Sequence, residues 1–325
     1  MKKFLLAVVA ACAALSWSTV WAWQPTRPIT VLIGFAPGSG NEMSFRAVAK
    51  EVERATGASF VVTNQPGADA AISLNNLVAA RPDGYTINIA SQQGTWVMAD
   101  VISKDMIKFT PDSFEYTVNI AKSPLALIAP VTSTVNTPAE FVRLIETTDK
   151  QVNIAVGASS HKLAYEYVMA HTRAKKDMIT AVNYKGPAPA GVDVAGGQVD
   201  FGIIPAAVAY NLVKAGRVKY IGIFGEQKLS RIPEVPLMQT VVPGANVYAG
   251  WGIVLPRGTP AEVTRWYTDN FVRAIRGTEA QQFFADNLMF VEERELTPQG
   301  YKTSMLALRR IWLPIAQKMD FGQTR

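Results

Sequence analysis

The stretch Thr30–Arg46 reads TVLIGFAPGSGNEMSFR and combines a buried-strand pattern, a glycine-rich turn and the start of a helix. The apolar run Thr30–Phe35 predicts a strand, and the small residues after it let the backbone approach a ligand closely. Phe45, Val48 and Val52 then fall on one face of a helix, whose first backbone N–H groups have no partner within the helix. A loop of this kind before a helix is typical of an anion-binding site.

Two further segments repeat this pattern of a strand followed by small and polar residues. Asn64–Asp69 follows the expected strand Ser59–Thr63, and Gly157–Lys162 follows the apolar run Val152–Val156. In the first of these segments Gly67 stands after a proline, where we expect a positive φ, as in a type II turn. The repeated pattern predicts one binding site built from several backbone loops, and no catalytic set of side chains accompanies it.

The first part of the chain alternates strands and helices. Thr30–Phe35, Ser59–Thr63 and Tyr85–Ala90 are expected strands, with a helix ended by Gly57 after the first and a helix at Asp69–Ala80 after the second. This βαβαβ order predicts a largely parallel sheet, in which ligands bind beyond the carboxyl ends of the strands. The segments that we expect to converge there are Ala36–Glu42, Gln65–Asp69 and Ser91–Gly94.

A second unit begins near Pro124. Its expected strands are Leu125–Ala129, Val152–Val156, Thr180–Tyr184 and Val199–Ile204, with helices at Pro138–Thr147 and His161–His171. Tyr220–Phe224 and Gly250–Leu255 continue the strand pattern along the chain. The chain after Pro260 is mainly helical in pattern, with further helix starts at Thr278 and Pro298. Helices without a sheet of their own pack most simply on the first unit, so the chain must cross between the units twice.

We expect these crossings near Ile120–Ser123 and Val247–Trp251. They predict an α/β protein with two lobes hinged around a cleft. Residues 23–121 and 249–325 form lobe one in this prediction, and residues 122–248 form lobe two.

The N-terminus predicts export. Lys2 and Lys3 precede an apolar run, and Val20-Trp21-Ala22 offers small residues for a signal peptidase, so residues 1–22 are an expected signal peptide cleaved after Ala22. Lipidation at Cys12 is the alternative. Cys12 is the only cysteine, so a mature chain without it has no disulfide, thiolate metal site or cysteine nucleophile. The formal net charge of +6 is spread along the chain, which gives no reason to expect nucleic-acid binding.

Several motifs in the sequence resemble parts of catalytic or cofactor sites, but none is complete. Gly38-Ser39-Gly40 lacks the third glycine of a dinucleotide fingerprint, since Met43 stands in its place, so no nucleotide cofactor is expected. Ser159, Ser160 and His161 suggest a hydrolase, but no G-x-S-x-G motif occurs. We expect the two serines to cap a helix and to donate to a ligand oxygen. The two histidines, His161 and His171, do not have the spacing of a common zinc pair, and no metal is expected.

Three alternatives remain open from the residues alone. Glu42 and Arg46 have the i, i+4 spacing of a surface ion pair, or they contact a ligand. Lys185 complements a carboxylate or only extends from a loop. Trp96 and Tyr165 flank an aromatic ligand or pack in the core.

In order along the chain, these segments resemble the substrate-binding proteins of tripartite tricarboxylate transporters, the Bordetella uptake gene (Bug) family. The resemblance covers essentially the whole mature chain and rests on an ordered set of motifs. These are F-x-P-G-x-x-x-[DE]-x-x-x-R at Phe35–Arg46, Asn64–Ala68, Pro82–Thr86, Leu163–Glu166, Tyr184–Gly186, Gly196–Asp200, Pro233–Pro236, and Trp251-Gly252 through Pro256–Pro260.

The resemblance implies a two-lobed periplasmic binding protein of type II, the Venus flytrap fold. Such a protein binds a small organic carboxylate and delivers it to the membrane permease subunits of the transporter, without a cofactor or metal, and a clamp that opens favours a monomer. The ligand-binding residues that it implies are Phe35, Ala36, Pro37, Gly38, Ser39, Asn41, Glu42, Gly67 and Ala68 in lobe one, and Ala158, Ser159, Ser160, Tyr184, Lys185, Gly186 and Ile204 in lobe two. The expected convergence of the strand ends adds Ser91 in lobe one. A sensing subunit that reports a ligand to a membrane kinase is the first alternative, and a periplasmic hydrolase or isomerase is the second.

This chain departs from the family pattern within the same loops. Ser39 stands for the usual second glycine of the first loop, Glu42 for the usual aspartate, and Ala70 and Ala158 for common glycines. Lys162 replaces a frequent histidine. Extra side chains at these positions are expected to reshape the cleft.

Overall fold

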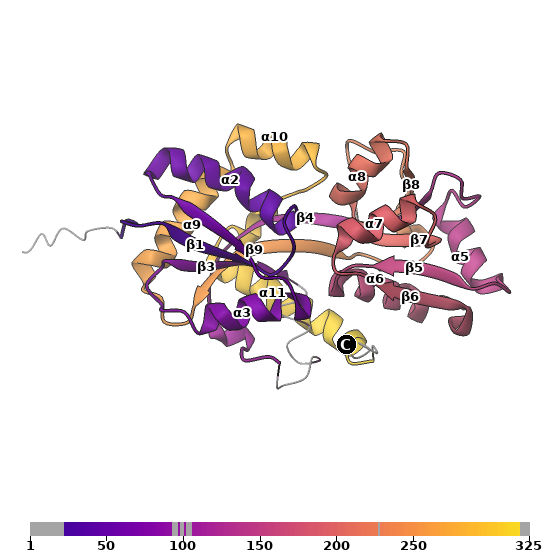
Figure 1. Cartoon of the computed structure of the whole chain (residues 1–325), viewed down its shortest axis with the longest axis horizontal. Helices are drawn as coiled ribbons and strands as arrows, with labels where there is room; N and C mark the ends of the chain where they lie inside the picture. The colour runs from indigo at the N-terminus through magenta and orange to yellow at the C-terminus, as the bar shows by residue number, and fades with distance from the viewer. Residues whose placement is uncertain (1–22, 93–96, 98–100, 102–105, 227, 319–325) are drawn as a thin grey trace, which may run out of the picture.

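Figure 1 shows the computed structural model of the chain, which describes residues 23–92, 97, 101, 106–226 and 228–318. The predicted signal peptide, with Cys12 and the cleavage site after Ala22, lies outside these residues, as does Trp96. No helix in the described part combines the length and the apolar character needed to cross a bilayer.

Lobe one begins with three parallel strands. β1 (Ile29–Ile33) pairs with β2 (Phe60–Asn64) and β3 (Thr86–Ser91). After β1 comes α2 (Gly40–Thr56), which buries Phe45, Val48 and Val52 on its apolar face. The helix ends at Gly57, whose φ of 74° is one that glycine adopts readily. Between β2 and β3 lie the short 3₁₀ helix η1 (Ala68–Ala70) and α3 (Ala71–Val78).

Two long strands join the lobes. β4 (Phe114–Pro130) pairs antiparallel with β9 (Tyr248–Pro256) as far as Pro124, and from Leu125 onward it pairs with two strands of lobe two. The chain therefore passes from one sheet to the other without leaving the extended conformation.

Lobe two repeats the alternation of strands and helices. Its strands are β5 (Val152–Val156), β6 (Ile179–Asn183), β7 (Phe201–Pro205) and β8 (Val218–Phe224), and its helices are α5 (Pro138–Thr147), α6 (Ser159–His171), α7 (Pro187–Ala195) and α8 (Ala206–Lys214). β5 is parallel to β6 and β7, whereas β7 and β8 both pair antiparallel with β4.

The chain ends in three helices that return to lobe one. They are α9 (Ala261–Ile275), α10 (Thr278–Asp286) and α11 (Pro298–Ala316), with the 3₁₀ helix η6 (Glu293–Glu295) before the last. Further 3₁₀ helices in the described part of the chain are η3 (Pro111–Ser113), η4 (Lys176–Met178) and η5 (Met238–Thr240). α9 and α10 pack on α2, and α9 and α11 pack on β4, which confirms the expected return of the tail. α11 also reaches lobe two, where the ring of Trp312 lies 5.7 Å from that of Tyr167 on α6.

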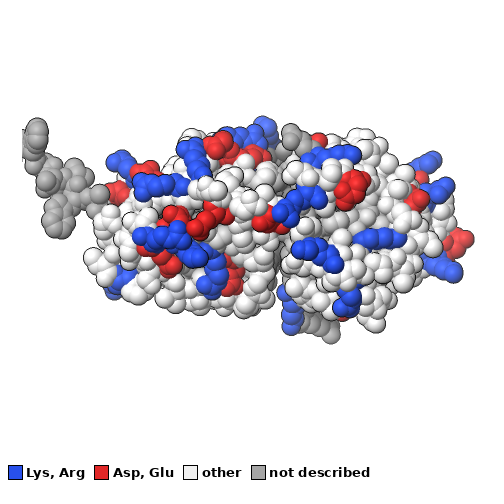
Figure 2. All heavy atoms as spheres, turned by 90° about the horizontal axis from the view of Figure 1, so that it is seen from above, with Lys and Arg blue, Asp and Glu red and all other residues white. Residues whose placement is uncertain are grey.

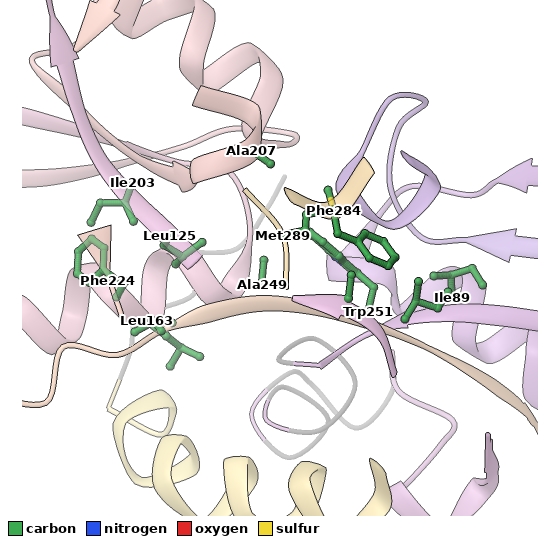
Figure 3. Close-up of a cluster of buried hydrophobic side chains, with 14 of the residues drawn as sticks. Ile89, Leu125, Leu163, Ile203, Ala207, Phe224, Ala249, Trp251, Phe284 and Met289 are labelled. Atoms are coloured by element: carbon green, nitrogen blue, oxygen red, sulfur yellow. The ribbon is translucent and has the colours of Figure 1, made fainter. Parts of the chain in front are cut away.

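The apolar core continues from one lobe into the other. One cluster of buried side chains contains Ile89 and Trp251 from lobe one, Leu125 from β4, and Leu163 and Ile203 from lobe two (Figure 3). The arrangement of the lobes is therefore supported by shared apolar packing as well as by the crossing strands.

The predicted two-lobed α/β fold is confirmed, and the bounds of α5 and β5 are those predicted. Two expectations were wrong. The sheet is mixed rather than largely parallel, because β4 and β9 run antiparallel to their neighbours. The strand expected at Leu125–Ala129 already begins at Phe114. The lobe boundaries at residues 121/122 and 248/249 stay a prediction.

Candidate functional site

The directions of the strands bring two sets of loops face to face. β1, β2 and β3 run parallel to β4, because β9 lies antiparallel between β3 and β4. β5, β6 and β7 run in the opposite sense, because β7 is antiparallel to β4. Since β4 runs from lobe one into lobe two, the carboxyl ends of both sets point to the boundary between the lobes (Figure 1).

The strand registers give the separation of the two sets. Through Trp251 of β9, Ser91 at the end of β3 is level with Ala121 of β4, whereas Pro205 at the end of β7 is level with Leu125. Four residue steps along an extended strand span about 13 Å. Because ligands of parallel sheets bind beyond the carboxyl ends of the strands, we place the candidate site between these two sets of ends.

In lobe one, Glu42 fastens the loop that follows β1. Its carboxylate accepts hydrogen bonds from the N–H of Gly38 and from Nδ2 of Asn64, each at 3.2 Å, and pairs with Arg46 at 2.7 Å. Asn64 Nδ2 also donates to the carbonyl of Phe35 at 2.9 Å. The first loop is thus tied to the end of β2.

Glu42 carries a negative charge at neutral pH. Burial raises the pKa of its carboxyl, but hydrogen bonds from Arg46, Asn64 and Gly38 outweigh burial and leave the pKa below its ordinary value. Of the two alternatives for Glu42 and Arg46, the ion pair is present in the structure. Contact between Glu42 and a ligand stays a prediction.

The second loop of lobe one has an unusual backbone. Gly67 has the expected positive φ, 134°, but its ψ of 151° does not fit a type II turn, so that expectation was wrong. Ala68 and Ala70 also have positive φ, 46° and 73°, which is unfavourable for residues with a Cβ. A Cβ on Gly34 would overlap that of Ala70, so a glycine is needed where the two loops meet.

In lobe two, the loops after β5 and β6 touch. A Cβ on Gly157 would overlap the carbonyl group of Gly186. The N–H of Gly157 donates to Nδ1 of His161 at 3.0 Å, and His161 is 1% exposed. Burial lowers the pKa of His161 to about 3, so the imidazole is neutral and its hydrogen lies on Nε2.

Two long helices begin at the site without a side-chain cap. Ser39 at the start of α2 and Ala158 at the start of α6 occupy the N-cap positions, and neither side chain makes a capping hydrogen bond. Because Ala158 takes the extended N-cap conformation, Ser159 and Ser160 are the first residues of α6, and their expected role as caps was wrong. The first N–H groups of a helix have no acceptor within it and carry a partial positive charge. Each lobe therefore offers a helix N-terminus suited to an anion.

The predicted ligand-binding residues differ in exposure. Ala36, Pro37, Gly38, Gly67 and Lys185 are exposed; Phe35, Ser39, Ala68, Ala158 and Tyr184 are partly exposed; Asn41, Glu42, Ser91, Ser159, Ser160, Gly186 and Ile204 are buried. Asn41 Nδ2 donates to the carbonyl of Ile89 at 3.0 Å. The side chain of Ile204 is 0% exposed within an apolar cluster of lobe two. These two side chains stabilise the fold, and their contact with a ligand stays a prediction.

The hydroxyls of two tyrosines near the site hydrogen-bond to the protein. Tyr184 donates to Asp193 at 2.8 Å. Tyr165 donates to the carbonyl of Ile179 at 3.0 Å and is 8% exposed, which agrees with the packing alternative for this ring.

A buried polar network beside the site was missed by the sequence analysis. Lys122 of β4 pairs with Glu295 at 2.6 Å and with Glu292 at 3.1 Å. Glu295 is 0% exposed and also accepts from Asn119 Nδ2 at 2.7 Å and from Gln92, the residue after Ser91, at 3.4 Å. Lys122 and Glu295 are 173 residues apart, and no local pattern connects them.

The groove along α9 in lobe one is separate from the candidate site. A groove of about 580 Å³ lies along α9, and its lining includes Asp269, Arg273, Arg276 and Glu293 but no residue of the strand-end loops. Across the residues that the structure describes, no group of three or more His, Cys, Asp and Glu side chains is arranged to hold a metal ion.

Comparisons with known proteins agree with this architecture. The family model described as "Tripartite tricarboxylate transporter family receptor" matches residues 44–305. A UPF0065 protein of Bordetella bronchiseptica is 27% identical over 270 residues, which cover 81% of this chain and 77% of that protein.

Two solved structures share the fold. MatC (Rpa3494) from Rhodopseudomonas palustris, with bound malate, has a TM-score of 0.80 and 22% identity, and the match covers 90% of this chain and 99% of MatC. The periplasmic binding protein BugD has a TM-score of 0.81 and 23% identity, with 90% and 98% of the chains covered. The resemblance seen in the ordered motifs is thus confirmed: the chain belongs to the receptor family of tripartite tricarboxylate transporters, a family of periplasmic solute-binding proteins.

Proposed function

We propose that this protein captures a small organic carboxylate between its lobes and delivers it to the membrane permease of a tripartite tricarboxylate transporter. The observation that carries the proposal is the pair of uncapped helix N-termini, of α2 and α6, at strand ends that face each other. Backbone N–H groups at such ends stabilise a carboxylate without a buried cation. The family and the malate bound to MatC support the same class of ligand.

The mechanism that we propose is closure of the lobes over the ligand. β4 and β9 are the connections that bend, and the closed form is the one that the permease recognises. No chemical step is involved, so the ligand should be recovered unchanged after incubation with the protein. Recovery of an altered compound would favour an enzyme instead.

A thermal-shift screen tests the ligand class. The protein is unfolded, freed of bound ligand and refolded, then heated with malate, adipate, citrate or the corresponding neutral amides. A ligand that binds only the folded state at 100 times its Kd stabilises it by about 2.7 kcal/mol. We expect carboxylates to raise Tm and amides to leave it unchanged; stabilisation by amides alone would contradict the proposal.

Substitution of Ala158 tests the anion site at α6. Ala158 has φ −164° and ψ 167°, so an aspartate there can accept from the first-turn N–H groups. Ala158→Asp should stabilise the unliganded protein by about 1 kcal/mol. It should also weaken carboxylate binding at least about tenfold, because a fixed carboxylate then occupies these donors.

Ala158→Asn is the matched control, since it caps the helix without adding a charge. It should give a similar stabilisation and a smaller loss of affinity. If Ala158→Asp binds carboxylates as tightly as the unaltered protein, the ligand charge does not lie at α6.

A further inference from the structure

The end of α10 connects the two lobes through an ion pair. Asp286, the last residue of α10 in lobe one, pairs with Arg231. Arg231 lies between β8 and η5, and its neighbour Ile232 is buried in the apolar cluster of lobe two. Arg231 also donates to the hydroxyl of Tyr210 on α8 at 3.2 Å. Figure 2 shows acidic and basic side chains meeting at the seam between the lobes, seen from above.

Leu288, two residues later, has a backbone conformation that suits glycine. Its φ is 54°. The N–H of Leu288 bonds to the carbonyl of Ala285 at 3.3 Å, and the N–H of Met289 bonds to that of Phe284 at 2.8 Å. This is the Schellman pattern that ends a helix, and Leu288 stands at its left-handed position, where glycine is usual and a leucine is strained.

The side chain of Leu288 explains why leucine stands there. It is 4% exposed and packs in an apolar cluster whose other buried members, among them Ala206, Ala209 and Val235, come from lobe two and β4. Burial of the Leu288 side chain against the opposite lobe thus accompanies, and offsets, an unfavourable backbone conformation.

The same segment ends on the crossing strand. The backbone of Phe290 exchanges two hydrogen bonds of 2.8 Å with the backbone of Lys122, and its ring lies 5.1 Å from that of Tyr248. Lys122 is itself fixed by Glu295. The segment Asp286–Phe290 therefore leaves α10, contacts lobe two through Leu288 and the Arg231 ion pair, and is fastened to β4.

We propose that the segment Asp286–Phe290 is a latch that holds the two lobes together and sets how far they open when no ligand is bound. Opening separates Leu288 from the cluster of lobe two and Asp286 from Arg231. Ile204 and Ala206, at the end of β7, belong to the same cluster as Leu288. Leu288, Asp286 and Arg231 themselves lie outside the loops that follow β1, β2, β5 and β6, so the latch acts whether or not the proposed ligand is correct.

The test measures the distance between the lobes in the ligand-free protein. Cys12, the only cysteine, is replaced by serine, and nitroxide labels are attached to cysteines introduced at Val61 and Val192, two exposed residues of lobe one and lobe two. Pulsed electron paramagnetic resonance (double electron–electron resonance) then gives the distribution of distances between the two labels. A thermal unfolding curve checks that each variant is folded.

We expect Leu288→Gly to remain folded, because glycine suits the backbone at this position, and to raise the population at long distances about tenfold. Asp286→Asn should raise this population about two- to threefold, because a half-exposed ion pair contributes little. The charge-swapped pair Arg231→Asp with Asp286→Arg should restore the original distribution. Glu51→Gln, which removes an ion pair within α2, is the matched control and should change nothing.

Distance distributions of folded Leu288→Gly and Asp286→Asn that match the unaltered protein would overturn the latch. So would a charge-swapped pair that opens as far as Asp286→Asn. Neither result depends on a ligand, so failure of the latch is distinguishable from failure of carboxylate binding.

Discussion

His161 is expected to make the folded state sensitive to acid. In the unfolded chain a histidine has a pKa of about 6.5, whereas burial lowers the pKa of His161 to about 3 in the folded protein. Below pH 6.5 the unfolded chain gains a proton that the folded chain does not accept. The contribution to stability is therefore complete above pH 6.5 and is lost as the pH falls from 6.5 to about 3.

The magnitude follows from the two pKa values. At pH 4.5 the linkage relation gives a loss of about 2.7 kcal/mol from this one group. Such a loss is a large part of the 5–15 kcal/mol that is typical of a folded domain. Protonation also turns Nδ1 into a donor, so the hydrogen bond from Gly157 breaks and the loop beside Gly186 loses its support.

Urea unfolding of the protein and of His161→Gln at pH 7.5 and pH 4.5 measures this effect. Glutamine keeps an acceptor for the N–H of Gly157 and does not titrate, so the variant should lose about 2.7 kcal/mol less between the two pH values. An NMR titration of the His161 ring proton, assigned by its absence from the variant, should show no protonation near pH 6. Equal losses of stability in both proteins would refute the buried neutral histidine.

Two further substitutions test the ionic contacts beside the site. Glu42→Gln should lower the free energy of unfolding by about 1 kcal/mol at pH 7 through loss of the charged contacts to Arg46 and Gly38. Because the pKa of Glu42 is lowered in the folded state, this difference in stability should disappear as the pH falls below 4.5 through the folded pKa. Urea titrations that show the same difference at every pH would contradict this prediction. Lys122→Met should lower the free energy of unfolding by about 3–5 kcal/mol, because the buried side chain of Glu295 loses its cationic partner. Glu295→Gln in the same chain should restore part of this loss, and calorimetric changes in Tm that simply add in the double variant would argue against the pair.

Elements whose signals are local were predicted well from the sequence. In α5, Pro138 occupies the first turn, and Thr137 and Glu140 form a reciprocal capping box, so the start of the helix is determined by four consecutive residues. Gly57 ends α2 in the left-handed conformation for a similarly local reason. Such features need no knowledge of the rest of the chain.

Features that depend on distant partners were missed. The first half of β4 is a strand because β9 lies beside it, and Lys122 is tolerated in a buried strand because Glu295 meets it there. Leucine is unfavourable at position 288 because the backbone there has a positive φ, and only the packing of its side chain against lobe two accounts for it. The missed features share a physical origin, since each contributes only when segments far apart in sequence are brought together.

The candidate site has local sequence signals but also depends on segments that are far apart in the sequence. Its predicted residues are mostly small, and their side chains carry little chemistry, so residue type alone identifies a flexible loop as readily as a binding loop. Their significance comes from the backbone N–H groups of α2 and α6, whose direction is set by the direction of the preceding strands β1 and β5. That those two directions oppose each other follows only from the antiparallel pairing of β4 with β7 after its pairing with β9. A site made of backbone groups is therefore predicted from topology, whereas an effect of side chains such as Glu42 and Ala158 on what it binds stays a prediction.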